Sequence, residues 1–315
     1  DSVASRGLGD VYKRQSLYNS IGPGIGPFPV SWALSIREPI ESSVQWLTIN
    51  PTFIAFTKGL RAYVTIYLMR PLDTYLTFMP WWYVMSAFVV IAWASVGIRF
   101  AFVSALLLLF IAACNIWTQA MITLSSVMIS VFFCFIIGVP IGILASYSKR
   151  FQNINEVILD AMQTLPYFCY LIPVLMFFGG NIVSAVIATV IYSVPPIIRL
   201  TALGLSQVSG GYSEVSKSFG GTGIQTLNKV KFPLAVPSLV MGFNQTVIMA
   251  FAMQIVTPLI GGKGLGLQVF NALQRSDTGR GLSAGLAIVL LAIIIDRITH
   301  AWTKKQRQAL GLDQS

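Results

Sequence analysis

Long apolar runs alternate with short polar stretches from residue 80 to near the end of the chain. A helix needs roughly 20 apolar residues to cross the hydrocarbon core of a bilayer. The pattern predicts seven spans, of which the third is long enough to project beyond the bilayer; they are 80–98, 100–117, 119–146, 157–179, 181–203, 236–260 and 282–301. We therefore expect an all-α, polytopic membrane protein with a transmembrane domain over residues 80–302.

The first two predicted spans are separated only by Gly97-Ile98-Arg99. A single helix across both would be far longer than a bilayer requires. We therefore predict a tight hairpin at Arg99.

The N-terminal part has a different character. Residues 1–15, DSVASRGLGDVYKRQ, lack the apolar core of a signal peptide, and we expect them to be a non-native leader. Residues 16–79 are expected to form an extracytoplasmic tail, irregular over its Gly-, Pro- and Ser-rich first half. Its second half, 51–79, mixes apolar residues with Lys58, Arg61, Arg70 and Asp73. An amphipathic helix lying on the membrane and a loop packed against its own protein both remain open for 51–79.

Composition supports a bilayer as the solvent. The 315 residues are 55% hydrophobic and only 10% charged, whereas soluble domains carry about 25% charge. The net charge of +10 raises the question of nucleic acid, but the basic residues are scattered and form no aromatic-interleaved patch. Three cysteines in apolar runs and a single histidine argue against a zinc site and a disulfide framework.

Lysine and arginine in short loops indicate which side faces the cytoplasm. With seven spans, three basic segments fall on one side: Lys149 and Arg150; Lys217, Lys229 and Lys231; and Lys304, Lys305 and Arg307. The loop over 204–235 and the tail over 303–315 are thus predicted to be cytoplasmic, and the N-terminus to be outside.

The stretch GYSEVSKSFGGTGIQTLNKVKFPLAVPS, residues 211–238, is the polar exception between two spans. Ser213 is predicted to cap a short helix that runs through Phe219 and ends at Gly220-Gly221, because glycine tolerates the left-handed turn of a helix stop. Thr222 and Gln225 match a T-x-x-Q capping box that starts a second helix.

The second predicted helix carries an apolar side formed by Ile224, Leu227 and Val230. We expect Pro233 to stop it and Pro237 to open the next span. Two capped helices are more structure than a connection requires. A self-packed surface loop and a docking element for a cytoplasmic partner are the two interpretations.

This loop resembles the EAA motif of ABC-importer permeases, E-A-A-x3-G-x9-I-x-L-P. Glu214, Val215 and Ser216 stand at E-A-A, and Gly220 stands at G. Val230, Phe232 and Pro233 follow at I, L and P, so the spacing fits throughout. The departures are changes of size, which affect only the fine fit to a partner.

The resemblance extends over roughly residues 75–302 and points to the glycine betaine/proline betaine branch of these permeases. It rests on DAMQTLPYFCYLIPVLMFFG (160–179), VPPIIRLTALG (194–204), NQTVIMAFAM (244–253), GGKGLG (261–266) and AIIIDRITHAW (292–302). It implies a membrane subunit of a type I ABC importer in a bacterial plasma membrane, with a role in osmoprotection.

The resemblance also implies partners. They are a second copy of the permease, two ATPase subunits on the cytoplasmic face and an extracytoplasmic solute-binding protein. The helix that carries the EAA motif, called the coupling helix, would sit in a cleft of the ATPase. The residues that the resemblance assigns to coupling are Glu214, Val215, Ser216, Phe219, Gly220, Gly221, Ile224 and Pro233. ATP would be used by the partner subunit, and this chain is expected to bind no cofactor.

The sequence itself offers no ATPase motif. GGKGLG lacks the spacing and the hydroxyl residue of G-x-x-x-x-G-K-[ST] and is read as a turn or gate element. Charged residues lie near the ends of spans, where snorkelling or local pairing explains them; they are Glu156, Asp160, Arg199, Asp296 and Arg297. Asp160 and Arg199 are a candidate pair between adjacent spans, and His300 is read as interfacial.

Prolines interrupt the third to fifth predicted spans, at Pro140, Pro166, Pro173 and Pro195-Pro196. They indicate either a pathway lining that flexes between two states or static kinks for packing. Tyr167, Phe168, Tyr170 and Tyr192 offer aromatic faces to a quaternary ammonium, although helix packing or lipid contact is the stronger explanation for them.

The resemblance therefore implies a permease that moves glycine betaine, proline betaine or a related quaternary amine inward. The alternatives are an ion-coupled carrier, an ABC permease for another small amine or amino acid, and a membrane enzyme. The chain has neither midplane carboxylates for ion coupling nor a clustered nucleophile or metal site for an enzyme.

Overall fold

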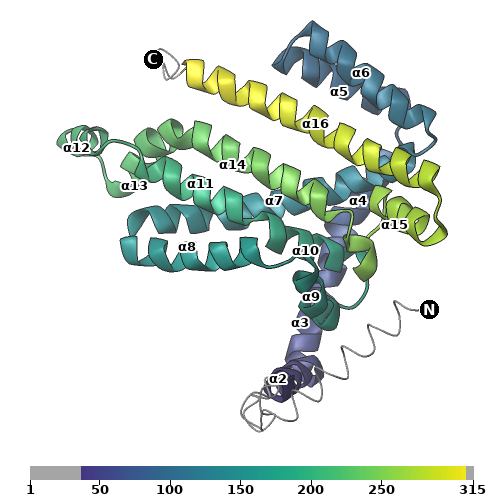
Figure 1. Ribbon diagram of the computed structural model, residues 1–315. Helices are drawn as coiled ribbons and strands as arrows, with labels where there is room; N and C mark the ends of the chain where they lie inside the picture. Colours follow the sequence, from purple (N-terminus) through teal and green to yellow (C-terminus); the bar gives the residue numbers. More distant parts are fainter. Residues whose placement is uncertain (1–36, 310–315) are drawn as a thin grey trace, which may run out of the picture. The chain divides into compact units, whose positions relative to one another are not determined.

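The computed structural model describes residues 37–309, and every regular element in that range is a helix (Figure 1). In chain order the elements are α2 (Arg37–Ile49), α3 (Pro51–Tyr63), η2 (Val64–Met69), α4 (Arg70–Phe78), α5 (Trp81–Ser95), α6 (Ile98–Ala113), α7 (Trp117–Tyr147), α8 (Lys149–Thr164), α9 (Phe168–Phe178), α10 (Ile182–Ser193), α11 (Pro195–Ser206), α12 (Gly210–Ser218), α13 (Gly223–Thr226), η3 (Leu227–Lys231), α14 (Phe232–Met253), η4 (Thr257–Ile260), α15 (Leu265–Arg275) and α16 (Thr278–Ala309). The predicted all-α fold class is confirmed for this range. The predicted leader over 1–15 lies outside the described residues.

Contacts between residues divide the chain into two units, 1–50 and 51–315. In the described part of the first unit, α2 buries none of its residues, and Arg37 pairs with Glu41 along one face at 2.7 Å. The second unit contains all the other helices. The segment over 51–79, which the sequence analysis groups with the tail, thus belongs to the same unit as the spans.

Segment 51–79 is helical almost throughout, as α3, η2 and α4. Its inner face packs Val64 and Met69 against Ile129 of α7 and Val183 and Val186 of α10. Of the two alternatives for 51–79, the helix is correct about the secondary structure and the packed loop is correct only about the packing.

Four helices of the described chain are long and apolar enough to cross a membrane unbroken. They are Trp117–Tyr147, Ile182–Ser206, Gly223–Met253 and Thr278–Lys304. Two pairs of helices pass the same test only together, and counting each pair as one span gives six, where the apolar pattern predicts seven.

One of the two bent pairs contradicts a predicted straight span. The run over 157–179 is not one helix, because α8 and α9 meet at 98° around Pro166, whose ring cannot continue a helix. The chain over Pro51–Phe78 meets α5 at 101°. The predicted hairpin between α5 and α6 is confirmed, and its turn lies at Gly97, which adopts a φ of +129°.

Close helix packing holds the middle of the unit together. A Cβ added at Gly138 or Gly142 of α7 would lie 2.4 or 2.6 Å from side-chain atoms of α11. Gly204 of α11 and Gly242 of α14 face each other's helices in the same way. Small residues allow such approach between spans, where apolar lipid gives no hydrophobic drive for association.

The two ends of this helix group carry different connections. At one end, the ammonium of Lys231 in η3 lies 5.9 Å from the ring centre of Tyr147, the last residue of α7. At the other end, the Leu265 N–H of α15 donates to the Thr123 hydroxyl in the first turns of α7, at 2.8 Å. The connection over α12 and α13 and the glycine turn before α15 thus lie at opposite ends of α7 (Figure 1).

Candidate functional site

The connection between α11 and α14 begins with α12. Its N-cap is Ser209, whose hydroxyl accepts the Gly211 N–H at 3.4 Å. The predicted cap at Ser213 is wrong, because the chain already turns into the helix at Gly210 and places residue 213 inside it. Glu214 therefore lies beyond the first turn, where the helix dipole favours a carboxylate less than predicted.

A glycine elbow ends α12, as predicted. Gly220 adopts a left-handed φ of +78°, and its N–H donates to the Lys217 carbonyl at 2.8 Å. The Gly221 N–H donates to the Ser216 carbonyl at 2.9 Å. These two bonds form a Schellman stop, which satisfies carbonyls that the helix end leaves unpaired.

The predicted capping box starts the next helix. The Thr222 N–H donates to the Gln225 side chain at 2.9 Å, and the Gln225 N–H donates to the Thr222 hydroxyl at 3.3 Å. Reciprocal bonds of this kind satisfy two donors at a helix start. The direction in which the chain leaves the elbow is therefore set by local hydrogen bonds.

The predicted stop at Pro233 does not occur. The helix continues from Gly223 to Met253, and Pro233 sits in the first turn of α14, directly after the π-helical segment η3. Pro233 lies where the wider hydrogen-bond pattern of η3 gives way to that of α14, so its missing N–H falls at a change of pattern within the helix. The connection is therefore continuous with a span.

One hydrogen bond joins the two short helices. The hydroxyls of Ser216 and Thr226 lie 2.8 Å apart, and Thr226 is buried while Ser216 is half-buried. A Cβ added at Gly221 would lie 2.6 Å from the Ser216 hydroxyl oxygen. The elbow thus folds back tightly on α12 and fixes its angle to α13.

Three large apolar side chains of α12, the elbow and α13 are exposed. Val215, Phe219 and Ile224 have exposed fractions of 57%, 89% and 74%. Glu214 is exposed beside them. In contrast, Leu227 packs against the core, so it does not share one face with Ile224 as predicted. The exposed set is the part of the connection that is open to another protein.

The remaining predicted site residues lie around the bent and broken helices. Pro166 occupies the break between α8 and α9, and Pro173 lies inside α9. Pro195 and Pro196 are buried at the start of α11. Pro140 does not interrupt α7, which stays helical through it.

Tyrosines from two helices gather near the break. Tyr170, which is buried, donates its hydroxyl to the Met162 carbonyl of α8. The rings of Tyr167 and Tyr170 each lie 6.3 Å from the ring of Tyr192 in α10. The aromatic groups that the sequence singled out are therefore brought together, and the Tyr170 bond ties the two halves of the bent pair to each other.

The predicted pair between Asp160 and Arg199 is confirmed. Arg199 Nη2 lies 2.6 Å from Asp160 Oδ1, joining α8 to α11. Both side chains are substantially exposed, so the ion pair contributes at most about 1 kcal/mol to the stability of the fold. His300 lies 3.5 Å from Asp296, one turn earlier on α16.

Two long-range contacts were not foreseen from the sequence. Ser125 of α7 donates to the carboxylate of Asp73 in α4, and Thr123 receives the Leu265 N–H. In the sequence, only the presence of hydroxyl residues inside an apolar run indicates such bonds, and it does not indicate which residue each hydroxyl contacts. Among residues 37–309, no group of three or more His, Cys, Asp or Glu side chains could hold a metal ion.

Residues 138–308 match the family described as binding-protein-dependent transport system inner membrane component. The glycine betaine/proline betaine transport system permease protein ProW of Escherichia coli (strain K12) is 38% identical over 268 residues, which are 85% of this chain and 75% of the relative. The glycine betaine transport system permease protein OpuAB of Bacillus subtilis (strain 168) is 36% identical over 269 residues, 85% of this chain and 94% of the relative.

A similar fold occurs in a chain of the MetNI methionine ABC transporter in an inward-facing conformation. The TM-score is 0.53 at 22% identity, over 58% of this chain and 92% of that chain. At this identity the likeness shows the fold alone.

Proposed function

Since the chain belongs to the family of binding-protein-dependent transport system inner membrane components, we propose that it carries glycine betaine or a related quaternary-amine compatible solute into the cytoplasm. As a member of this family it is a transport subunit of an inner membrane. The observation that supports the solute class is that relatives matched along most of the chain are named as glycine betaine permeases.

In this proposal ATP is hydrolysed on a separate ATPase chain that contacts the connection between α11 and α14. The support is the exposed apolar side of that connection, formed by Val215, Phe219 and Ile224, with Glu214 beside it. Aromatic and aliphatic side chains that stand clear of their own protein are typical of a docking surface.

The geometry suggests how movement of the ATPase reaches the spans. The Ser216–Thr226 bond and the elbow fix α12 to α13, and the helix from Gly223 continues to Met253 without a break. A displacement of α12 would therefore tilt α14. A partner that binds one tilt better than the other shifts the balance between inward and outward states.

The proposed assembly has two copies of this permease, two ATPase subunits and an extracytoplasmic solute-binding protein. The end with α12 faces the cytoplasm, and the glycine turn before α15 faces outside. The basic residues near α12, including Lys217 and Lys231, support this orientation.

Uptake by the complete transporter tests the solute. The permease, its ATPase and its binding protein are reconstituted in vesicles, and ATP-dependent accumulation of radiolabelled glycine betaine, proline betaine, carnitine and trimethylamine N-oxide is measured. We expect glycine betaine or proline betaine to accumulate most strongly. Accumulation without ATP, driven by an ion gradient, would contradict the proposal.

A further inference from the structure

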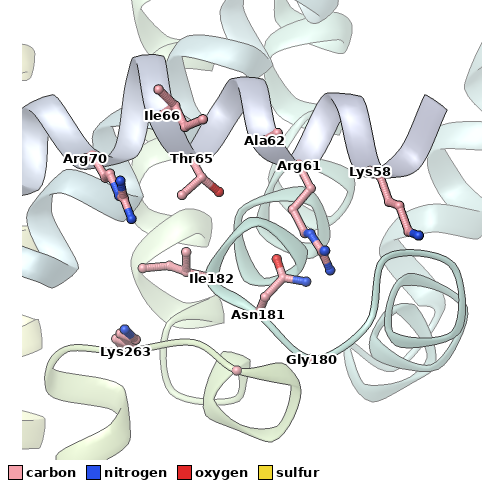
Figure 2. Close-up of a pocket in the computed structure, with 11 residues that line it drawn as sticks. Lys58, Arg61, Ala62, Thr65, Ile66, Arg70, Gly180, Asn181, Ile182 and Lys263 are labelled. Carbon is pink, nitrogen blue, oxygen red and sulfur yellow. The ribbon is translucent and has the colours of Figure 1, made fainter. Parts of the chain in front are cut away.

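A pocket of about 580 Å³ is lined in part by the glycine turn before α15 (Figure 2). This turn lies at the end of α7 opposite α12 (Figure 1). The helical segment α3–η2–α4 forms one wall, and the chain before α10 and the glycine turn before α15 form the other. The lining residues are Lys58, Arg61, Ala62, Thr65, Ile66, Arg70, Gly180, Asn181, Ile182, Gly261 and Lys263.

The lining carries four cations and no acidic residue. Three cations come from the helical wall, and Lys263 comes from the opposite wall, so positive charge faces the cavity from two sides (Figure 2). None of the ion pairs found among residues 37–309 involves any of these four side chains. Asp73 attracts Lys263, but it does not line the pocket and its carboxylate accepts from Ser125. The cavity therefore keeps an excess of positive charge.

The polar groups of Asn181 are already used by the protein. Its side-chain oxygen accepts the N–H groups of Val183 and Ser184, and its amide donates to the Phe178 carbonyl at 2.7 Å. The start of α10 is thus capped from within. An anion in the pocket would be held by the four basic side chains and not by the helix end.

The wall that supplies three of the cations also has a strongly apolar outer side. Phe56, Tyr63 and Tyr67 are each more than half exposed. Basic residues beside exposed aromatic rings are typical of a segment at the membrane–water interface. Ala62, Ile66 and Ile182 line the pocket itself, so the cavity offers both charge for a headgroup and apolar surface for the adjoining chains.

We propose that this pocket binds the phosphate headgroup of an anionic phospholipid. Basic pockets beside membrane spans are suited to anionic lipid headgroups, because each cation near the charge adds to the attraction. A small soluble anion would gain nothing from the apolar flank. The leaflet is the outer one under the orientation in the proposed function, whereas the chemistry of the pocket is independent of that orientation.

Lipid binding by the purified permease tests the proposal without transport or ATPase. Native mass spectrometry of the detergent-solubilised full chain measures binding of phosphatidylglycerol and of phosphatidylethanolamine with the same acyl chains. Phosphatidylethanolamine is the reference because its headgroup does not resemble the proposed solute. The test variant is Arg61→Gln with Lys263→Gln. The control is Arg275→Gln, an exposed cation of α15 outside the pocket.

We expect wild type and the control to prefer phosphatidylglycerol, and the double variant to bind it on the order of 25-fold more weakly, from roughly fivefold per cation. A second double variant, Lys58→Gln with Arg70→Gln, serves if the first does not give a folded species by size-exclusion chromatography. Equal binding by wild type and a folded variant would overturn the proposal. Displacement of the lipid by equimolar inorganic phosphate would also overturn it, in favour of a free-anion site. A transporter that fails to take up betaines would leave the lipid result unchanged.

Discussion

The hydroxyl of Ser216 lies 2.8 Å from the hydroxyl of Thr226, ten residues later, and this contact closes the glycine elbow between α12 and α13. Thr226 is buried, so its hydroxyl has little access to water as an alternative partner. The bond makes the two short helices one body. It is the natural place to test whether the angle between them matters for coupling.

Thr226→Val keeps the shape of the side chain and removes the hydroxyl. The loss of the bond should cost about 1 kcal/mol locally, which is too little to prevent insertion of the spans. We expect ATPase stimulation by the solute-loaded binding protein to fall several-fold in the reconstituted complex. Ser218→Ala is the matched control, because that hydroxyl bonds only within α12, to the Glu214 carbonyl. Equal stimulation in both variants would show that the elbow angle does not affect coupling.

Gly220→Pro should abolish most transport while the protein still reaches the membrane. Proline cannot adopt a φ of +78°, and it removes the N–H that donates to Lys217. Gly220→Asn is the matched control, because asparagine tolerates the left-handed region and a Cβ at this position meets no atom within 4 Å. Uptake at equal expression is the measurement. Wild-type uptake by the proline variant would show that the elbow is not needed for coupling.

Glu214→Gln should weaken retention of the ATPase on the purified permease. Glu214 is exposed and lies beyond the first turn of α12, so a role in stabilising the helix start is small. A partner cation that is desolvated against it would lose far more when the carboxylate is removed. Co-purification of the ATPase and solute-stimulated hydrolysis are compared with wild type. If neither changes, Val215, Phe219 and Ile224 remain the candidate contact.

Reporter fusions test the orientation. Fusions after Gln152 and Gln306 should report the cytoplasm, and a fusion after Lys263 should report the outside. The sides of these three positions relative to one another depend only on the helices from α7 onward, so the number of spans before α7 does not affect them. A cytoplasmic signal at Lys263 would reverse the proposed orientation and move the basic pocket to the inner leaflet.

The capping box and the glycine elbow could be predicted because both are local. Thr222 and Gln225 are three residues apart, and Gly220 needs no distant partner to adopt its turn. The start of α12 at Ser209 was missed because serines at 209 and 213 offer the same cap, and only the path of the chain out of α11 selects one. The stop predicted at Pro233 is wrong because a proline that ends a helix and a proline within a continuous helix have the same sequence signal.

Contacts between distant segments could not be predicted from one sequence. The bond from Ser125 to Asp73 and the convergence of Lys263 with Arg61 around one pocket depend on how α4 and the glycine turn pack. The Asp160–Arg199 pair was foreseen because opposite charges at the ends of adjacent spans have few other partners. The sequence analysis predicts only a kink or hinge at Pro166, whereas the structure has a 98° bend between α8 and α9 at this residue.

The glycines of α7 determine which parts of the permease can shift. Gly138 and Gly142 bring α7 so near to α11 that neither helix can slide along the other without a clash, and Gly204 and Gly242 hold α11 against α14 equally tightly. A displacement of α12 would therefore tilt α7, α11 and α14 together as one rigid group within the membrane. We expect the angle to change between α8 and α9, where the chain is already broken and where the bond from Tyr170 to the Met162 carbonyl would have to open. Spin labels on α7 and α11 should keep one separation in all nucleotide states, whereas labels on α8 and α9 should not.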